Sequence, residues 1–352
     1  MTISPPANVN EDFQVLASGV DYLVLAVDVN WHDRDFFPYL EKKKQEAKKE
    51  KTEQPIPFSN NPQHFFKIKE FGSKGYSWLL YNAEYFLTIG DWLTPQSRPS
   101  LMITIASETL WRLGPKEAIQ FILYFVESHG KIMSVKPSRL DLCLDLLFPR
   151  KLWSPGFTMY AVTRATAMQT YFKHGKLTGI GIGKGKIMAR LYDKPTEIAQ
   201  QSNKVWMYHI WGIESVPDGF LEFRVECELG RELLQEMELN CVWDTLPHLE
   251  NVWGYCSEKW LKFQSNPGQH HTQRQTFKWW EIVQNSFLGI QGPEPLIRSK
   301  AIRLKEKQLL DQTFGSMTGI SALKRPYEAD TPFDEVKMED LIEDFLDASI
   351  NH

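Results

Sequence analysis

Cysteine is scarce in this sequence, and its spacing excludes two kinds of protein. Four cysteines occur in 352 residues, at Cys143, Cys227, Cys241 and Cys256, and no two of them form a CxxC pair. Neither a disulfide-stabilised scaffold nor a cysteine zinc site is therefore indicated. Because free thiols are typical of a reducing compartment, we expect a cytoplasmic protein.

Long apolar segments are also missing. No run approaches the ~18–20 apolar residues that a bilayer span requires. The first residues, MTISPPANVNEDFQ, contain neither the basic n-region nor the apolar h-region of a signal peptide. We therefore expect a protein that is not exported and has no membrane partner.

Motifs for nucleotide binding and for histidine-based metal binding are absent as well. In the segment GIGIGKGK, the residue five positions before Gly185 is Ile180, and no Ser or Thr follows Lys186, so a Walker loop is excluded. No register gives GxGxxG, and the nine histidines form no HxH or HExxH motif. The segment predicts a flexible hairpin in which Lys184 and Lys186 contact a phosphate backbone, and no nucleotide cofactor is expected.

Charge is unevenly distributed along the chain. The 40 Lys and Arg against 44 Asp and Glu give a net charge of -4, but residues 326–352 alone hold nine acids and one base. The remaining residues keep 39 bases and 35 acids, a net charge of +4. We expect 326–352 to be either a disordered acidic tail or a tail whose EDLIEDFLDA stretch covers a basic surface or docks on a partner.

The order of periodic segments predicts an α+β fold, with a mainly antiparallel sheet and packed helices. Short alternating runs predict strands, and a Gly-Pro pair opens a helical pattern at residue 115. Residues 155–173 also read as helical, and residues 177–193 as a hairpin that turns at 183–185. The predicted parts are an N-terminal extension (1–18), a main domain (19–235) with a charged excursion (31–64), a helical region (236–325) and the acidic tail (326–352).

Strict alternation places polar residues on one face of several predicted strands. In Ser138–Leu146, four leucines point one way, and Arg139, Asp141, Cys143 and Asp145 point the other way. Cys143 is expected to pack as a small apolar residue despite its position. Two further segments repeat the pattern, with Arg190, Tyr192 and Lys194 in one and Glu222, Arg224, Glu226 and Glu228 in the other.

If one sheet aligns these segments, carboxylates, a phenol and cations meet on one surface. Carboxylates at this spacing provide hard oxygen ligands for Mg²⁺ or Mn²⁺. A tyrosine beside a cation can attack phosphorus, because positive charge favours the phenolate. The alternative is a solvated sheet face that is held together by cross-strand Arg–Glu pairs.

Three segments, SRLDLCLDL, GIGKGKIMARLYDKPTE and FLEFRVECEL, together resemble the Rep_trans (replication initiation factor) family of rolling-circle plasmid and phage initiators. That family shows an R-x-D-x-x-x-D strand, an R-hydrophobe-Y-D/N-K-x-x-E segment and an R-x-E strand in this order. The resemblance covers roughly residues 19–235. It implies a fold related to the HUH (His-hydrophobe-His) endonucleases without their histidine pair.

The resemblance also implies origin-specific DNA nicking and strand transfer through a 5′-phosphotyrosine, in the cytoplasm of a prokaryote that carries a plasmid or phage. Tyr192 would be the nucleophile, and Lys194 and Glu197 its motif partners. The expected nucleic acid partner is origin DNA, either as a single strand or as an extruded hairpin. A host helicase and a host polymerase are expected protein partners, and a homodimer is a further option. The remaining expected roles are phosphate screening by Arg190 and Lys194, Mg²⁺ or Mn²⁺ binding by Asp141, Asp145 and Glu226, and DNA binding by Lys184, Lys186, Arg139 and Arg224.

Two alternatives stay open at this point. A conjugative or mobilisation relaxase uses the same tyrosine chemistry but usually supplies histidines for its metal. A sequence-specific DNA-binding or copy-control protein would use the three motifs only as structure. As comparison residues for Tyr192, we select Tyr171, Tyr208 and Tyr255, which the sequence places in helical or loop-like contexts.

Overall fold

The computed structural model describes residues 13–58, 61–265 and 273–287, and these fall within one compact unit that spans residues 1–294. Residues 288–325 of the predicted helical region and the acidic tail 326–352 lie outside the described residues. No described helix is both long and apolar enough to cross a bilayer.

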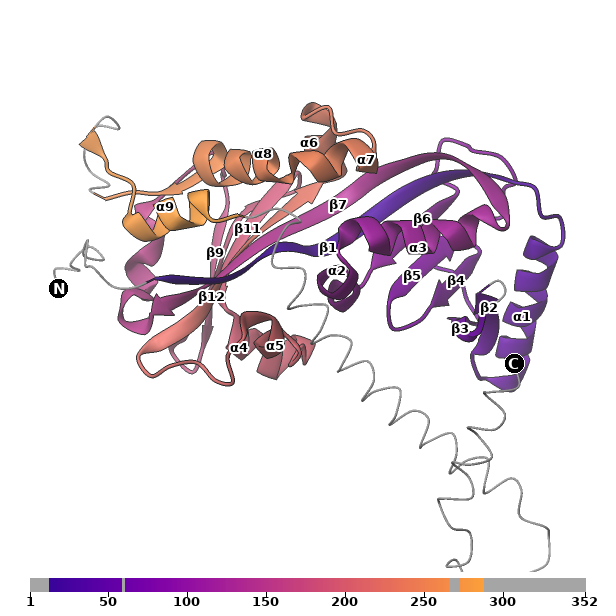
Figure 1. Cartoon of the computed structure of the whole chain (residues 1–352), viewed down its shortest axis with the longest axis horizontal. Helices are drawn as coiled ribbons and strands as arrows, with labels where there is room; N and C mark the ends of the chain where they lie inside the picture. The colour runs from indigo at the N-terminus through magenta and orange to yellow at the C-terminus, as the bar shows by residue number, and fades with distance from the viewer. Residues whose placement is uncertain (1–12, 59–60, 266–272, 288–352) are drawn as a thin grey trace, which may run out of the picture. The chain divides into compact units, whose positions relative to one another are not determined.

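An eleven-stranded antiparallel sheet organises the described chain, which confirms the predicted α+β class. Two long strands, β1 (Gln14–Trp31) and β7 (Gly130–Pro149), pair along almost their whole length at its centre (Figure 1). The strand order is β2-β3-β4-β5-β6-β1-β7-β12-β11-β10-β9. The other strands are β2 (Gln54–Phe58), β3 (Asn61–Ile68), β4 (Trp78–Tyr81), β5 (Tyr85–Ile89), β6 (Leu101–Ile105), β9 (Met168–Lys173), β10 (Lys176–Lys184), β11 (Ile187–Asp193) and β12 (Phe220–Gly230).

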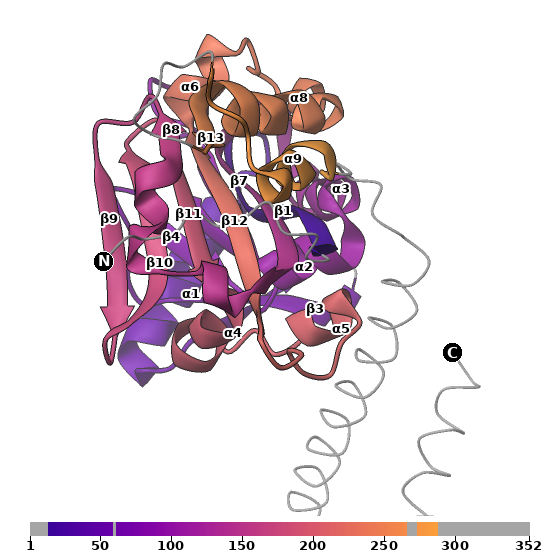
Figure 2. The same ribbon diagram turned by 90° about the vertical axis from the view of Figure 1, so that its left-hand side faces the viewer.

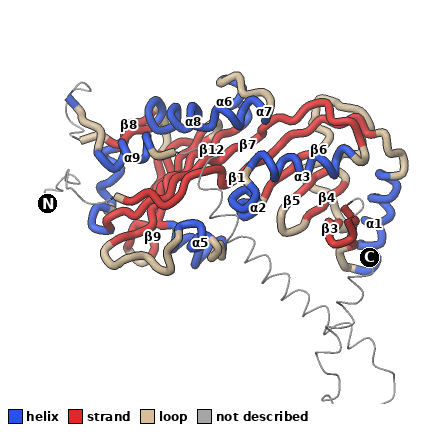
Figure 3. The backbone as a smooth tube through the Cα atoms, in the orientation of Figure 1, coloured by secondary structure: helices blue, strands red, loops and turns tan. Residues whose placement is uncertain are grey.

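Short helices connect and cover these strands (Figure 3). The α3 helix begins at the predicted Gly-Pro pair, with Pro115 in its first turn. A small second sheet pairs β8 (Ala161–Thr163) with β13 (Leu261–Phe263). The helices are α1 (Phe36–Glu50), α2 (Ser107–Leu113), α3 (Pro115–Glu127), α4 (Lys194–Glu197), α5 (Met207–Trp211), α6 (Arg231–Glu236), α7 (Val242–Thr245), α8 (Leu249–Gly254) and α9 (Lys278–Asn285).

One face of the sheet carries the main core. The four predicted leucines of β7 are buried there, and α6, α8 and α9 lie over this face (Figure 2). Aromatic rings join the two layers, since Phe148 of β7 lies edge-on to Trp279 of α9 with ring centroids 5.4 Å apart. The helices after residue 236 therefore share the core of the sheet, and the predicted boundary at 235 separates no compact unit within the described chain.

The opposite face is partly covered by α2, α4 and α5. Trp111, Ile198, Met207 and Trp211 from this layer enclose Cys143 in a second apolar cluster. Cys143 is fully buried there, as predicted from its size. This cluster borders the polar residues of β7, β11 and β12.

Three sequence-based predictions of local structure are corrected. Residues 155–173 form a short 3₁₀ helix at Pro155–Tyr160 and then β8 and β9, because β9 pairs with β10 and completes the sheet. In the charged excursion 31–64, α1 agrees with a basic helix over the run LEKKKQEAKKEK, but the β2–β3 hairpin was not predicted. The N-terminal extension 1–18 is too long, because β1 already begins at Gln14.

The predicted hairpin is confirmed by the pairing of β10 with β11. Its last paired residues are Lys184 and Ile187, so Gly185 and Lys186 make the turn, which corrects the predicted turn at 183–185. Gly185 adopts φ +81°, a conformation that residues with a Cβ rarely adopt.

Candidate active site

The three predicted polar segments lie side by side on β7, β12 and β11. Arg224 stands between Asp145 and Tyr192 in one cross-strand row. In the next row Glu226 stands between Cys143 and Arg190. The alternation that the sequence shows on each strand therefore becomes one polar face of the sheet, and the helical layer over this face buries part of it.

Tyr192 is held by a carboxylate on the neighbouring strand. Its Oη donates a hydrogen bond to Oε2 of Glu226 at 2.8 Å, and the other oxygen of Glu226 accepts from Nη1 of Arg190 at 2.9 Å. Burial and the Glu226 charge raise the pKa of Tyr192 well above its ordinary value. The phenol is thus protonated at rest, with a proton acceptor already in contact.

Lys194 follows Tyr192 as the first residue of α4. The Asp193 side chain caps this helix by accepting from the backbone N–H of Thr196 at 3.0 Å. The Lys194 side chain is only 2% exposed, its Nζ pairs with Glu197 at 2.5 Å, and it lies 5.4 Å from the centre of the Tyr192 ring. Burial, with help from Arg224 and Lys204, lowers the pKa of Lys194.

Asp141 lies beside a second group of carboxylates. It accepts two hydrogen bonds from Arg139, at 2.8 and 2.6 Å. Burial, with the nearby charges of Glu226 and Glu228, nevertheless raises the pKa of Asp141 to about 7. Arg139 and Arg190 both also pair with Glu228, so two arginines share three carboxylates.

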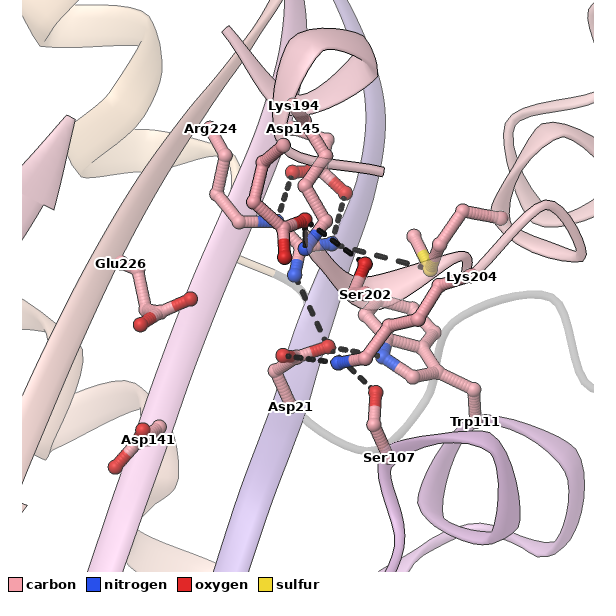
Figure 4. Close-up of polar contacts among 12 residues, drawn as sticks. Asp21, Ser107, Trp111, Asp141, Asp145, Lys194, Ser202, Lys204, Arg224 and Glu226 are labelled. Carbon is pink, nitrogen blue, oxygen red and sulfur yellow. Dashed lines mark hydrogen bonds and ion pairs between the residues drawn. The ribbon is translucent and has the colours of Figure 1, made fainter. Parts of the chain in front are cut away.

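Asp145 belongs to a separate buried ion pair (Figure 4). Its oxygens accept from Nε and Nη2 of Arg224 at 2.6 and 2.7 Å, and from the indole N–H of Trp211 at 2.8 Å. Arg224 is 0% exposed, so the expectation that it binds DNA is corrected: its guanidinium cannot reach a ligand on the surface. Asp145 and Arg224 therefore form a buried structural ion pair below the exposed part of the polar face.

Asp21 completes this ion-pair cluster, and the sequence analysis did not identify it. Its carboxylate contacts Nη1 of Arg224 at 3.0 Å, Nζ of Lys204 at 3.2 Å, the Ser107 hydroxyl at 2.8 Å and the Trp111 indole at 3.1 Å. Although burial opposes it, the positive charges hold the pKa of Asp21 well below its usual range. A lone acid inside the apolar run GVDYLVLAV was the available signal.

The predicted DNA-binding lysines differ in their surroundings. Lys186 is exposed but pairs with Glu232 at 3.4 Å and with Glu236 at 2.5 Å. Lys184 is exposed at the end of β10. Arg139 is 36% exposed, although Asp141 and Glu228 engage it.

The three predicted metal ligands do not form one set. No group of three histidine, cysteine or acidic side chains in the described ranges is placed to hold a metal ion. The Asp145 oxygens already bind Arg224 and Trp211, whereas Asp141 lies close enough to Glu226 for the Glu226 charge to raise the pKa of Asp141. Asp141 and Glu226 therefore fit the chemistry of Mg²⁺ or Mn²⁺, provided that the cation takes the place of an arginine.

The comparison tyrosines also occupy different elements. Tyr171 lies in β9, which corrects its expected helical or loop-like context. Tyr208 lies in α5, and Tyr255 begins a π-helical turn at Tyr255–Trp260.

The buried pair predicts a large stability effect for Asp145→Asn. This substitution removes one charge and leaves Arg224 partly uncompensated, so we expect the free energy of unfolding to fall by about 3–5 kcal/mol. Asp28→Asn is the matched control, because Asp28 pairs with the half-exposed Lys136 at 2.9 Å and should cost at most about 1 kcal/mol. Urea denaturation measures both. Normal stability with lost activity in Asp145→Asn would instead indicate a direct chemical role.

Glu222 predicts a pH dependence of stability. It is fully buried, and neither oxygen has a hydrogen-bond partner among the described residues. Burial and the charges of Asp145 and Asp193 raise the pKa of Glu222 from 4.5 to about 8. The folded state therefore keeps a proton that the unfolded chain releases, and the free energy of unfolding should fall as the pH rises from 4.5 to about 8. Urea denaturation across this pH range should show a smaller fall in the free energy of unfolding for Glu222→Gln than for the wild type. If the free energy of unfolding of both proteins falls equally steeply with pH, Glu222 is not the group responsible.

Comparison of this chain with known proteins finds similarity only among solved structures. No family model matches the sequence, and no curated protein matches it. Among solved structures, the chain is similar to a rolling circle replication initiator protein from Geobacillus stearothermophilus, at 13% sequence identity and a TM-score of 0.44. The match covers 78% of this chain and 97% of that one.

Proposed function

We propose that this protein is a rolling-circle replication initiator that nicks DNA through Tyr192. The observation that carries the proposal is the contact between the Tyr192 hydroxyl and Glu226, on a sheet face that also holds Asp141, with the buried Lys194 of α4 5.4 Å from the centre of the Tyr192 ring. A phenol with a proton acceptor and a nearby ammonium has the parts that attack on phosphorus requires. The resemblance of the three strand motifs to the Rep_trans family points to the same chemistry.

In the proposed reaction, Oη of Tyr192 forms a bond to the scissile phosphorus while its proton passes to Oε2 of Glu226. The bond between phosphorus and the 3′ oxygen breaks, and that oxygen takes a proton to become a 3′-hydroxyl. We assign that proton to Lys194, whose Nζ lies 5.4 Å from the centre of the Tyr192 ring and whose pKa burial lowers. The product is a 5′-phosphotyrosine, which conserves the bond energy for a later strand-closing transfer, and a 3′ end that a polymerase can extend.

Asp141 and Glu226 are the side chains that would hold Mg²⁺ or Mn²⁺. When bound, the cation supplies positive charge that polarises the phosphate. Both oxygens of Glu226 already have a partner, Tyr192 or Arg190, so a bound cation would have to replace Arg190 if Tyr192 keeps its contact. Asp145 has no part in this proposal.

The proposed function is tested with labelled single-stranded oligonucleotides that tile the protein's own gene and its flanks. Incubation with Mn²⁺ should yield a shortened labelled strand and a protein–DNA complex that survives boiling in detergent. Both products should come from the same oligonucleotide. If every oligonucleotide is only bound and none is cleaved, the protein is a DNA-binding or copy-control protein.

Metal removal gives a separate prediction. Cleavage should stop in EDTA and return with added Mg²⁺ or Mn²⁺, because Asp141 and Glu226 are the carboxylates that we propose to hold the cation. Asp141→Asn should lower the cleavage rate by about 10²-fold, the range that loss of one strong electrostatic contact produces. Cleavage at full rate in EDTA would remove the metal from the mechanism and leave the tyrosine chemistry standing.

A further inference from the structure

The end of the sheet beside Tyr192 carries a strongly positive stretch of chain. Residues 146–192 contain eight Lys and Arg residues and no Asp or Glu. Several of these cations pair with acids from other segments, as Arg190 and Lys186 do. Lys173, Lys176 and Lys184 on β9 and β10 have no such partner within the described residues.

Two of these lysines are placed directly opposite each other. Lys173 ends β9, Lys176 begins β10, and the two are partners in the antiparallel register. Like charges in this arrangement repel and destabilise the pair unless an anion lies between them. A phosphate bound at this end of the hairpin would relieve that repulsion.

A tyrosine, Tyr171, lies two residues before Lys173 in β9, and Figure 2 shows β9 at the edge of the sheet. Tyr171 is 48% exposed, and its ring covers the backbone of β10 at two glycines. A Cβ on Gly179 would meet Cδ2 of Tyr171 at 3.5 Å, and a Cβ on Gly181 would meet its Oη at 3.5 Å. Because these glycines have no side chains, one side of the ring rests on the sheet and the rest stays open.

The register places this ring in the row of the candidate nucleophile. Gly179 is the partner of Tyr171 on one side and of Tyr192 on the other. Two strand spacings, about 10 Å, separate the two tyrosine backbones. A nucleic acid strand whose phosphate reaches Tyr192 would thus have a flanking base near Tyr171.

We propose that Tyr171 is a base-stacking platform for single-stranded DNA, with Lys173 and Lys176 binding the adjacent phosphate. This inference rests on the proposed function for the identity of the ligand and adds a binding site to it. Aromatic rings that lie on a sheet bind bases of any sequence through stacking, and neighbouring lysines bind the backbone. Tyr171 touches no reacting atom, so its role is binding.

The test measures the affinity of the full-length protein for a fluorescein-labelled oligothymidylate of roughly 12 nucleotides. Tyr171→Ala should weaken binding by about 5- to 150-fold, the range of one lost base stack. Tyr171→Phe should keep the wild-type affinity within about twofold, because its ring remains and the lost hydroxyl contacts only Gln169 among the described residues. The logarithm of the binding constant falls linearly with the logarithm of the salt concentration. Replacing both Lys173 and Lys176 by Gln should make this slope less steep by about 1.4, as expected for the loss of two phosphate contacts on a single strand.

Phe172→Ala is the matched control. Phe172 is 51% exposed on the same strand, but its register partner Leu177 is buried, which places both on the opposite face of the sheet. Its removal should leave the affinity unchanged. Wild-type affinity in Tyr171→Ala would overturn the proposal, as would equal losses in Tyr171→Ala and Phe172→Ala.

The same measurement separates the two proposals. Weak oligonucleotide binding by Tyr171→Ala supports the platform even if the wild-type protein cleaves no DNA. Normal binding by Tyr171→Ala together with cleavage by the wild-type protein would remove the platform and keep the nicking function. If both alanine variants instead change the oligomeric state without changing the affinity, β9 is an interface between two copies of this chain, and the platform is wrong.

Discussion

Tyr192→Phe should abolish both DNA cleavage and the covalent protein–DNA complex while DNA binding persists. Phenylalanine keeps the ring but lacks the oxygen that would attack phosphorus. The lost hydrogen bond to Glu226 should lower the free energy of unfolding by about 1.5–3 kcal/mol, because the acceptor is charged. Gel assays for cleavage and for the detergent-stable complex, with urea denaturation for stability, measure these effects.

The other tyrosines provide the controls for this result. Tyr208→Phe and Tyr255→Phe alter rings outside the polar face, and Tyr171→Phe keeps the ring that the second proposal requires. All three variants should form the covalent complex. Loss of the complex in one of them, together with its persistence in Tyr192→Phe, would move the nucleophile to that residue.

Glu226→Gln should give the second-largest loss, at least about 10²-fold in the rate of cleavage. The amide cannot take the proton from Tyr192 at neutral pH, and it is a poorer ligand for a divalent cation. Single-turnover cleavage of a labelled oligonucleotide measures the rate. DNA binding should change little, because Glu226 is only 7% exposed and is not one of the exposed lysines proposed to contact DNA.

Glu228→Gln is the matched control for Glu226→Gln. Both glutamates lie on β12 and bind Arg190, but only Glu226 contacts the Tyr192 hydroxyl. A general loss of charge on this strand would slow both variants equally. We expect the cleavage rate to fall in Glu226→Gln and not in Glu228→Gln. Equal cleavage rates in the two variants would mean that Glu226 is only a structural partner of Arg190.

Local periodicity was enough to predict the polar faces of the strands. A strand places alternate residues on opposite faces, so the leucines of β7 and the acids that alternate with them were assigned correctly from the sequence alone. The hairpin of β10 and β11 also followed from local turn residues. In each of these cases the signal lies within one segment.

Most of the site residues and ion pairs that the sequence did not predict depend on contacts between segments far apart in the chain. Asp21 approaches Arg224 only because β1 pairs with β7 and β7 with β12, and this pairing is not visible in local sequence. The same holds for Lys186, whose partners come from α6. Asp145 and Arg224 were assigned to metal and DNA binding because spacing gives the face of a residue but not its depth.

Mass mapping of the covalent protein–DNA complex is the most direct measurement of the central claim. After cleavage in Mn²⁺, protease and nuclease digestion should leave one peptide that carries a nucleotide, and fragmentation should place the nucleotide on Tyr192 within LYDKPTE. A nucleotide on any other residue, or cleavage of DNA without any covalently modified peptide, would contradict the account.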